Sequence, residues 1–309
     1  MKLTKLDFYD FARELVASGE DVIGMSTGEP DFDTVSSAAE AGIEAIRAGQ
    51  TKYTAGDGTP ALKEAIKHKF LRDNELSYDL KQISVSTGGK QVIYNAMAAT
   101  LNPGDEVIIP TPYWVLYPVM VAMCGGTPVF VKCHSKDGFA LNSEALEAAI
   151  TTKTKWLFLN FPNNPSGGIM DRKDLEGIAE VLRRHPNVHV MTDDMYEFLQ
   201  FTKERFVSLA QVAPDLYDRV LTVNGMSKGY AMTGWRIGFA GGRPDLIGAM
   251  AKVQSQITAN PCSIAQAAAE KALIASPDHV EGWQKIYIER RDIVIKALNN
   301  INGIQAETP

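Results

Sequence analysis

Two short apolar runs with a helical segment between them decide the fold: Lys155-Trp-Leu-Phe-Leu159, then residues 171–184, then Val188-His-Val-Met191. Each run has the length and composition of a strand. A helix between two strands typically connects them in parallel within one sheet. This stretch therefore predicts a β-α-β unit.

The same alternation continues on both sides of this unit. Thr59-Pro60 opens a helix with apolar residues four apart, Gly88-Gly89 precedes a second helix, and Ser143 is the predicted N-cap of a third. Further strands are predicted at 106–109, 128–131, 219–223 and 236–240, and further helices at 245–257, 263–275 and 279–300. The predicted class is α/β, with a mostly parallel sheet flanked by helices.

Composition excludes several classes of protein. The chain has 309 residues, a formal charge of −6 and 45% apolar residues, so it is neither low-complexity nor a basic nucleic-acid binder. The ten N-terminal residues lack the apolar core of a secretory signal. The apolar stretch 115–124 is broken by Pro118 and is too short to cross a bilayer. We expect a cytoplasmic protein that acts on neither nucleic acid nor membranes.

Cysteine and histidine spacing predicts no metal site. The three cysteines are scattered, which fits a reducing compartment and no disulfide framework. His185 and His189 are four residues apart, but Pro186 lies between them and prevents a shared helix face.

Polar residues follow the predicted strands at 111–114, 160–168, 193–196 and 224–228. The carboxyl ends of parallel strands meet at one edge of a sheet, and ligands bind beyond that edge. These four segments therefore predict one binding site.

Common nucleotide and hydrolase motifs are absent. The segment 84–91 does not match the P-loop motif, because its first residue is not glycine and its last is neither serine nor threonine. The chain also has no G-x-G-x-x-G and no G-x-S-x-G. Gly88-Gly89 nevertheless offers backbone amides at a helix start, where a phosphate can bind. Lys228 follows a strand and is the candidate reactive amine, with Arg236 as a fixed cation eight residues on. The simpler reading of Lys228 is an exposed loop lysine.

A lysine, a carboxylate, a phenol, an amide and a phosphate seat together suit pyridoxal phosphate, whose protonated ring needs a buried carboxylate. Seven motifs occur in the order found in class I aminotransferases: Gly28-Glu-Pro-Asp31, Lys52-Tyr53, Gly88-Gly-Lys90, Pro112-Tyr-Trp114, Asn163-Asn-Pro-Ser-Gly167, Asp193-Asp-Met-Tyr196, and Ser227-Lys228 with Gly234-Trp-Arg236-Ile-Gly238. From about Val22 onward the chain resembles this family, and within it the shorter bacterial aspartate aminotransferases.

The resemblance implies roles around the cofactor ring. Lys228 matches the lysine that bonds the cofactor and moves the substrate proton. Asp193 matches the partner of the ring nitrogen, against the alternative of a helix N-cap. Tyr196 and Asn164 match the groups that hydrogen-bond the phenolic oxygen, and Trp114 matches the stacking ring; core packing is the alternative for both aromatic residues. The neighbouring Asp194 and Asn163 are expected to be structural.

The resemblance also implies a phosphate site and a dimer. Gly88, Gly89, Ser227 and Arg236 match the phosphate cradle, although Gly225 stands where many relatives have a serine donor. Tyr53 matches a tyrosine that reaches the phosphate from a neighbouring subunit, which predicts a homodimer; the alternative is a tyrosine packed in its own chain.

Four residues are implied to contact substrate: Gly28, Lys90, Trp114 and Asn164. Gly28 matches the N-terminal segment that passes over the substrate α-carboxylate. Lys90 matches a lysine associated with the distal carboxylate of aspartate or glutamate, and a solvated lysine is the alternative. A cation at a helix start is disfavoured by the helix dipole, which favours a functional reason for it.

The implied activity is transfer of the amino group of aspartate to 2-oxoglutarate by a two-stage pyridoxal/pyridoxamine cycle. Aromatic amino acids, prephenate or alanine are alternative substrates, and C–S lysis is an alternative reaction. A regulatory homologue without catalysis is disfavoured because Lys228, Asp193, Tyr196 and Arg236 are all present.

The implied domains are an N-terminal arm and small-domain segment at 1–35, a large cofactor-binding domain at 36–281, and the start of an incomplete small domain at 282–309. The family's C-terminal arginine, which pairs with the substrate α-carboxylate, has no match among these residues. We therefore expect the 309-residue chain to bind cofactor and to transaminate poorly.

Overall fold

The computed structural model describes residues 5–23 and 28–309. Its contacts divide the chain into residues 1–33 and residues 34–309, and each unit is described by itself. The first unit contains α1 (Lys5–Ala17), which ends where Ser18 Oγ donates a hydrogen bond to the Leu15 carbonyl. The domain boundaries expected at residues 35 and 281 stay predictions.

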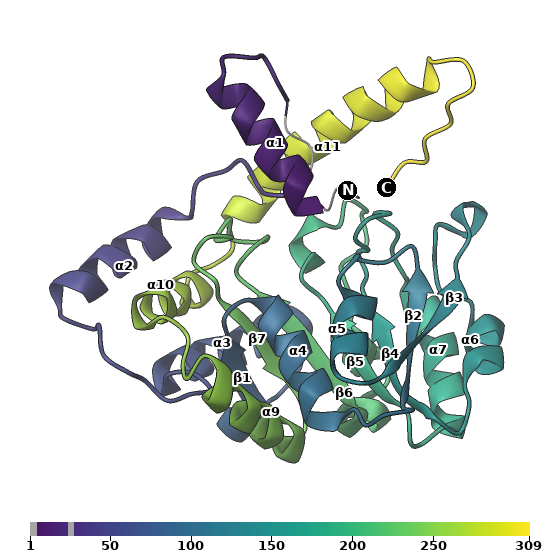
Figure 1. Cartoon of the computed structure of the whole chain (residues 1–309), viewed down its shortest axis with the longest axis horizontal. Coiled ribbons are helices and arrows are strands. Elements are labelled where there is room, and N and C mark those ends of the chain that lie inside the picture. Colours follow the sequence, from purple (N-terminus) through teal and green to yellow (C-terminus); the bar gives the residue numbers. More distant parts are fainter. Residues whose placement is uncertain (1–4, 24–27) are drawn as a thin grey trace. The chain divides into compact units, whose positions relative to one another are not determined.

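The second unit is built on one seven-stranded sheet with the order β1-β7-β6-β5-β4-β2-β3 (Figure 1). The strands are β1 (Ile83–Ser86), β2 (Glu106–Thr111), β3 (Thr127–Lys132), β4 (Thr154–Leu159), β5 (His189–Asp193), β6 (Val220–Gly225) and β7 (Gly238–Gly241). Of these described strands, β7 alone runs opposite to the other six. The predicted mostly parallel α/β sheet is confirmed.

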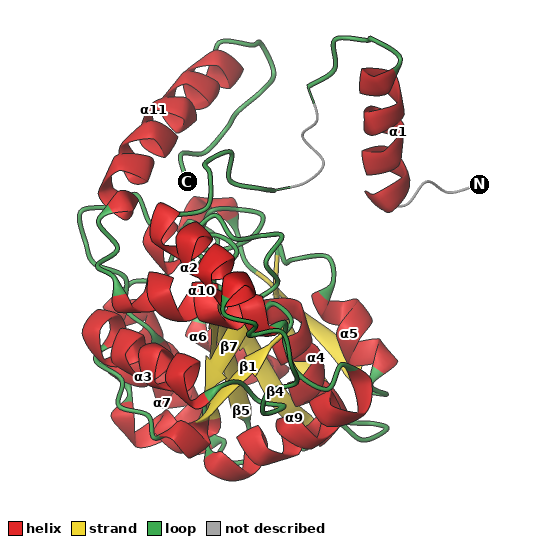
Figure 2. Ribbon diagram, turned by 90° about the vertical axis from the view of Figure 1, so that its left-hand side faces the viewer, coloured by secondary structure: helices red, strands yellow, loops and turns green. Residues whose placement is uncertain are grey.

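Helices cover both faces of the sheet (Figure 2). The longer ones are α2 (Ser36–Arg47), α3 (Pro60–Asn74), α4 (Gly89–Thr100), α5 (Tyr117–Met123), α6 (Ser143–Ala149), α7 (Arg172–Arg184), α9 (Pro244–Ile257), α10 (Ser263–Ile274) and α11 (His279–Asn299). Successive strand residues point to opposite faces. Val107 and Ile109 accordingly join a cluster with α4, α5 and α9, whereas Ile108 joins the cluster that includes α3, α7 and α10.

Several predicted element boundaries are confirmed. The helix predicted at Thr59-Pro60 begins there, because Thr59 Oγ1 accepts a hydrogen bond from the Leu62 amide at 3.3 Å. The helices predicted from 245, 263 and 279 are α9, α10 and α11. Turn and cap residues therefore located helix starts well.

Other boundaries were wrong, each for a local reason. The N-cap of α6 is Asn142, whose Oδ1 accepts from two following amides, so Ser143 is the first helical residue. The strand predicted from Arg236 begins at Gly238, because Arg236 has a left-handed φ of +59° that interrupts the extended backbone. β1, α2 and α5 were not predicted.

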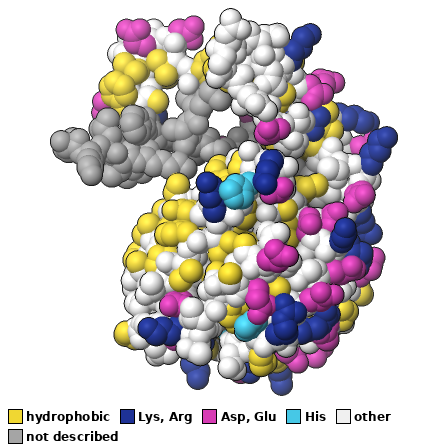
Figure 3. Space-filling view, turned by 90° about the vertical axis from the view of Figure 1, so that its right-hand side faces the viewer, with side chains coloured by type: hydrophobic (Ala, Val, Ile, Leu, Met, Phe, Trp, Pro, Cys, Tyr) yellow, Lys and Arg dark blue, Asp and Glu magenta, His cyan; other side chains and the backbone are white. Residues whose placement is uncertain are grey.

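Figure 3 shows acidic and basic side chains interspersed over the face that carries α6 and α7. Pairs on this face, such as Arg184 with Glu147, are exposed and add little to stability. Among the helices that the structure describes, none is long and apolar enough to span a bilayer. The three cysteines are free thiols.

Candidate active site

The end of β5 places a buried carboxylate at the carboxyl edge of the sheet. Asp193, the last residue of β5, is 7% exposed. Tyr117, at the start of α5, donates its hydroxyl to Asp193 Oδ2 at 2.6 Å. Asn160, which follows β4, donates to the Asp193 carbonyl at 2.9 Å. Residues that follow β2 and β4 thus converge on Asp193 at the end of β5.

Asp193 Oδ1 meets no hydrogen-bond donor among the described residues, although it is buried. Burial raises the pKa of Asp193, and the Tyr117 hydrogen bond lowers it. A buried acceptor without a partner is costly and indicates a missing donor. A protonated ring nitrogen supplies such a donor, so this carboxylate fits the ring of pyridoxal phosphate.

Asn164 and Tyr196 form a pair beside this carboxylate. Asn164 Nδ2 donates to the Tyr196 hydroxyl at 3.1 Å, and its own amide donates to Asn160 Oδ1 at 2.9 Å. Burial and the charge of Asp193 raise the pKa of Tyr196 to about 12. The phenol is therefore protonated at neutral pH and can donate a hydrogen bond to an anionic oxygen.

The glycine pair lies against Arg236 at the start of α4. Gly88 has φ +83°, and a Cβ there would overlap Arg236 Nη2. A Cβ at Gly89 would lie 2.7 Å from Met195 Cε. Arg236 Nη1 donates to the Thr233 carbonyl at 2.8 Å. A guanidinium beside the start of a helix forms a cradle suited to a phosphate, although the Gly88 amide itself donates to the Ser86 carbonyl at 2.8 Å.

We expect Gly88→Ala to weaken binding of pyridoxal phosphate at least tenfold, because the added methyl group displaces Arg236. It should also destabilise the fold by about 1–3 kcal/mol, the cost of a backbone conformation that only glycine adopts easily. Gly104→Ala is the matched control, since Gly104 has φ +94° with nothing within 4 Å of an added Cβ. Urea unfolding and cofactor titration measure the two effects, and equal cofactor affinity in both variants would contradict the cradle.

Lys228 follows β6 and is half-buried, three residues after the strand ends and next to the buried Ser227. The loop is closed by a hydrogen bond from the Met226 amide to the Ile237 carbonyl at 3.0 Å. A Cβ at Gly225 would lie only 3.0 Å from that carbonyl oxygen. A larger residue at position 225 would therefore require this neighbouring backbone to shift slightly.

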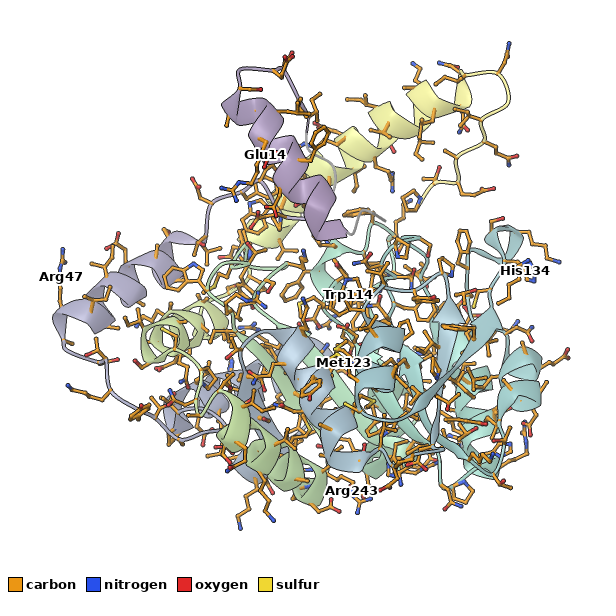
Figure 4. The ribbon with its side chains drawn as sticks, viewed as in Figure 1. Glu14, Arg47, Trp114, Met123, His134 and Arg243 are labelled. Carbon is orange, nitrogen blue, oxygen red and sulfur yellow. The ribbon has the colours of Figure 1, made fainter. Side chains whose placement is uncertain are left out.

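Trp114 and Lys90 lie together at the same edge. Lys90 Nζ lies 5.7 Å from the centroid of the Trp114 ring, within the range of a cation–π contact. The Trp114 ring packs edge-on against Tyr117 at 5.4 Å, so it is also connected to the partner of Asp193. Figure 4 marks Trp114 above the strands.

Two of the predicted residues stay predictions: Tyr53, which was expected to reach a neighbouring subunit, and Gly28. Tyr53 lies in the loop between α2 and α3 and is 92% exposed, so it does not pack in its own chain. Gly28 belongs to the unit 1–33. Asn163 is a turn residue as expected: its Oδ1 accepts from Ser166 Oγ at 2.7 Å.

A buried ionic network behind the site was not predicted. Lys69 of α3 forms an ion pair with Glu197 and donates to Asn74 Oδ1 at 2.6 Å. Glu197 also accepts from Asn74 Nδ2 and from Asn224 Nδ2, each at 2.8 Å. Glu197 directly follows Tyr196, and Asn224 lies four residues before Lys228. The network therefore joins the two segments that carry most of the site.

Tyr117 and Asn160 are further site residues that motif reasoning missed. Asn160 was predicted only as the first residue of the polar segment 160–168, without a role of its own, and Tyr117 only as part of an apolar stretch. In the part of the chain that the structure describes, no group of three or more His, Cys, Asp or Glu is placed to hold a metal ion.

Residues 20–309 match the family "Aminotransferase class I and II". An aspartate/prephenate aminotransferase of Cereibacter sphaeroides is 54% identical over 96% of this chain and 74% of its own length. The crystal structure of the aspartate aminotransferase from Rhizobium meliloti is 48% identical, with a TM-score of 0.95 over 100% of this chain and 80% of its own. The aspartate aminotransferase from Thermus thermophilus with maleate is 40% identical, with a TM-score of 0.91 over 100% of this chain and 81% of its own. This chain therefore belongs to the class I and II aminotransferases, which are pyridoxal-phosphate-dependent enzymes.

Proposed function

We propose that this aminotransferase moves the amino group of aspartate to 2-oxoglutarate. The observation that supports this most is the unpartnered Asp193 Oδ1, buried at the sheet edge beside the Asn164–Tyr196 pair. A carboxylate there keeps a pyridine nitrogen protonated. Bound pyridoxal phosphate supplies an aldehyde that captures amines and a ring that accepts an electron pair.

Different residues at this edge of the sheet would hold different parts of the cofactor. The phosphate would be held by the helix start at Gly89, the Ser227 hydroxyl and the Arg236 guanidinium, with Gly88 leaving room for that guanidinium. Asp193 holds the ring nitrogen, and Tyr196 and Asn164 donate to the phenolic oxygen. Trp114 packs against the ring face, with its own position fixed by Tyr117.

Lys228 Nζ is the amine that would hold the cofactor covalently. As a free amine it removes the proton from the substrate Cα and later returns a proton, which is general acid–base work. The loop after β6 keeps Lys228 at the same edge as Asp193, so both act on one bound molecule.

Lys90 supports a substrate with a second carboxylate. It is a cation at a helix start, beside the ring that we place over the cofactor. Maleate, the ligand of the Thermus thermophilus relative, is a dicarboxylate. Prephenate is the second candidate substrate, since the Cereibacter sphaeroides relative is named for aspartate and prephenate.

The test of substrate class compares Lys90→Gln with Lys173→Gln, an exposed lysine of α7, in the cofactor-loaded protein. We expect Lys90→Gln to raise the half-saturating aspartate concentration by about 10- to 150-fold, the range for one charge-assisted hydrogen bond. The response to alanine, which has no distal carboxylate, should stay unchanged. The shift of the cofactor absorbance on adding amino acid measures both. Equal losses for aspartate and alanine would contradict the role of Lys90.

We also propose a homodimer in the cytoplasm, with Tyr53 contributed to the partner's phosphate site. The 92% exposure of Tyr53 supports a contact outside its own chain. The free thiols support a reducing compartment.

A further inference from the structure

A second polar cavity, of about 430 Å³, lies at the opposite edge of the sheet, where the strands β2, β4, β5 and β6 begin. Lys153 and Lys155 flank the start of β4, and Arg219 directly precedes β6. Arg243 follows β7, which runs the other way and so ends at this edge. Figure 4 shows Arg243 below the strands and Trp114 above them, so this cavity is separate from the cofactor site.

The lining is strongly cationic although the whole chain carries −6. It contains four cationic side chains and one carboxylate, Asp105. Asp105 is occupied by a hydrogen bond from the Asn102 amide at 2.9 Å. A concave site lined by one sign of charge focuses the field and concentrates ions of the opposite sign. Its volume lies in the range of small-molecule sites.

Lys153 and Lys155 supply the positive charge that a ligand could meet. Arg219 donates to the His185, Val188 and Leu182 carbonyls at 2.9–3.0 Å, and both Arg243 hydrogen bonds go to Asp245. Lys153 and Lys155 form no ion pair with any described residue. Their ammonium groups are therefore available to a ligand, while Arg219 adds a charge that its carbonyl partners do not neutralise.

His189 lies within the same group of charges. Its ring lines the cavity and packs against Trp156 at 5.2 Å. Burial lowers the pKa of His189, and the charges of Arg243, Lys155 and Arg219 lower it further. An imidazole with a lowered pKa is neutral at pH 7 and can donate one N–H to an anion.

We propose that this cavity binds a compact polyanion that carries phosphate groups, at a site distinct from the cofactor phosphate. Lysines act as point charges and suit the tetrahedral, multiply charged phosphate group. Planar carboxylates prefer the fork of an arginine, and both arginine forks here are already used. The chemistry thus favours a di- or triphosphate over a tricarboxylate of similar charge.

Pyrophosphate is the probe, and calorimetric titration of the cofactor-loaded protein, freed of excess cofactor, is the measurement. We expect saturable binding that weakens as salt is added. Lys153→Gln combined with Lys155→Gln should weaken it about tenfold or more. Lys136→Gln combined with Lys173→Gln makes the same charge change on exposed positions elsewhere and should leave affinity nearly unchanged.

A local readout identifies the cavity directly. A bound anion stabilises the imidazolium, so pyrophosphate should raise the pKa of His189 in an NMR titration, and His189→Gln assigns the signal. Equal affinity in the cavity and control variants, an unmoved His189 pKa, or citrate binding as tightly as pyrophosphate would each overturn the proposal.

Discussion

Lys228→Ala is expected to remove the covalent link to the cofactor completely and to lower turnover by at least about 10²–10⁴-fold, the usual share of general acid–base catalysis alone. The same side chain has two tasks, bonding the cofactor and moving the substrate proton. No neighbouring group in the sequence motif replaces it, since Ser227 and Gly229 on either side are not amines. Both tasks are therefore lost in one substitution.

Borohydride reduction followed by mass spectrometry measures the link without relying on activity. Reduction makes the bond between lysine and cofactor permanent, so the wild-type peptide containing Lys228 should gain the cofactor mass. The Lys228→Ala protein should gain none at any lysine. Lys252→Ala is the matched control, because Lys252 is an exposed lysine of α9.

The variant should still bind the cofactor without the covalent bond. Asp193, Tyr196 and the Gly88–Arg236 cradle are unchanged, so the phosphate and the ring keep their contacts. A reduced adduct on a different lysine would move the reactive amine away from Lys228. Loss of all cofactor binding would instead show that the cradle contributes little.

The predictable part of the site is the part that follows from topology. Asp193, Asn164 and Lys228 lie just beyond the ends of three strands, and a parallel sheet brings such ends together whatever the details of packing. Gly88 was recognisable because bare amides at a helix start bind phosphate. The order of strands and helices along the chain is enough to place these residues at one edge of the sheet.

The unpredicted part depends on pairings between distant residues. Tyr117 meets Asp193 across 76 positions, and Asn74 meets Glu197 across 123. No local pattern distinguishes Tyr117 from a tyrosine that only packs. α2 was missed for a similar reason: its Gly42 is a weak helix former, and the helix is secured by packing, since a Cβ there would lie 2.7 Å from the Trp235 ring.

Lys69→Met is expected to lower the free energy of unfolding by about 3–5 kcal/mol, the usual cost of removing one partner of a buried ion pair. Lys69 is 1% exposed and Glu197 is 7% exposed, so water cannot replace the lost ammonium group. Methionine keeps the length and apolar stem of lysine, so the substitution tests the effect of removing the charge. Lys285→Met, which breaks the exposed pair with Glu281, should change stability little.

A double-mutant cycle separates the pair from packing. Glu197→Gln leaves the buried Lys69 with only the Asp73 carboxylate, 3.9 Å away, and should also destabilise strongly. The double variant removes both charges together, so its loss should be smaller than the sum of the two single losses by about 2 kcal/mol or more. Additive losses would show that the two side chains do not interact in solution as they do in the structure.

The pH dependence of the stability of the Lys69→Met variant tests the ion pair in a further way. Burial and the charge of Glu197 raise the pKa of Asp194, and the charge of Lys69 lowers it, so removing that cation should raise the pKa of Asp194 further. The folded variant then holds a proton that the unfolded chain releases, so its stability falls as pH rises. The deficit relative to wild type should therefore be larger at pH 8 than at pH 5 in urea unfolding. Because Glu197 follows Tyr196 directly, Lys69→Met should also weaken cofactor binding, whereas Lys285→Met should not. A deficit that grows as pH falls would mean that Lys69 does not stabilise the charged form of the buried carboxylates beside it.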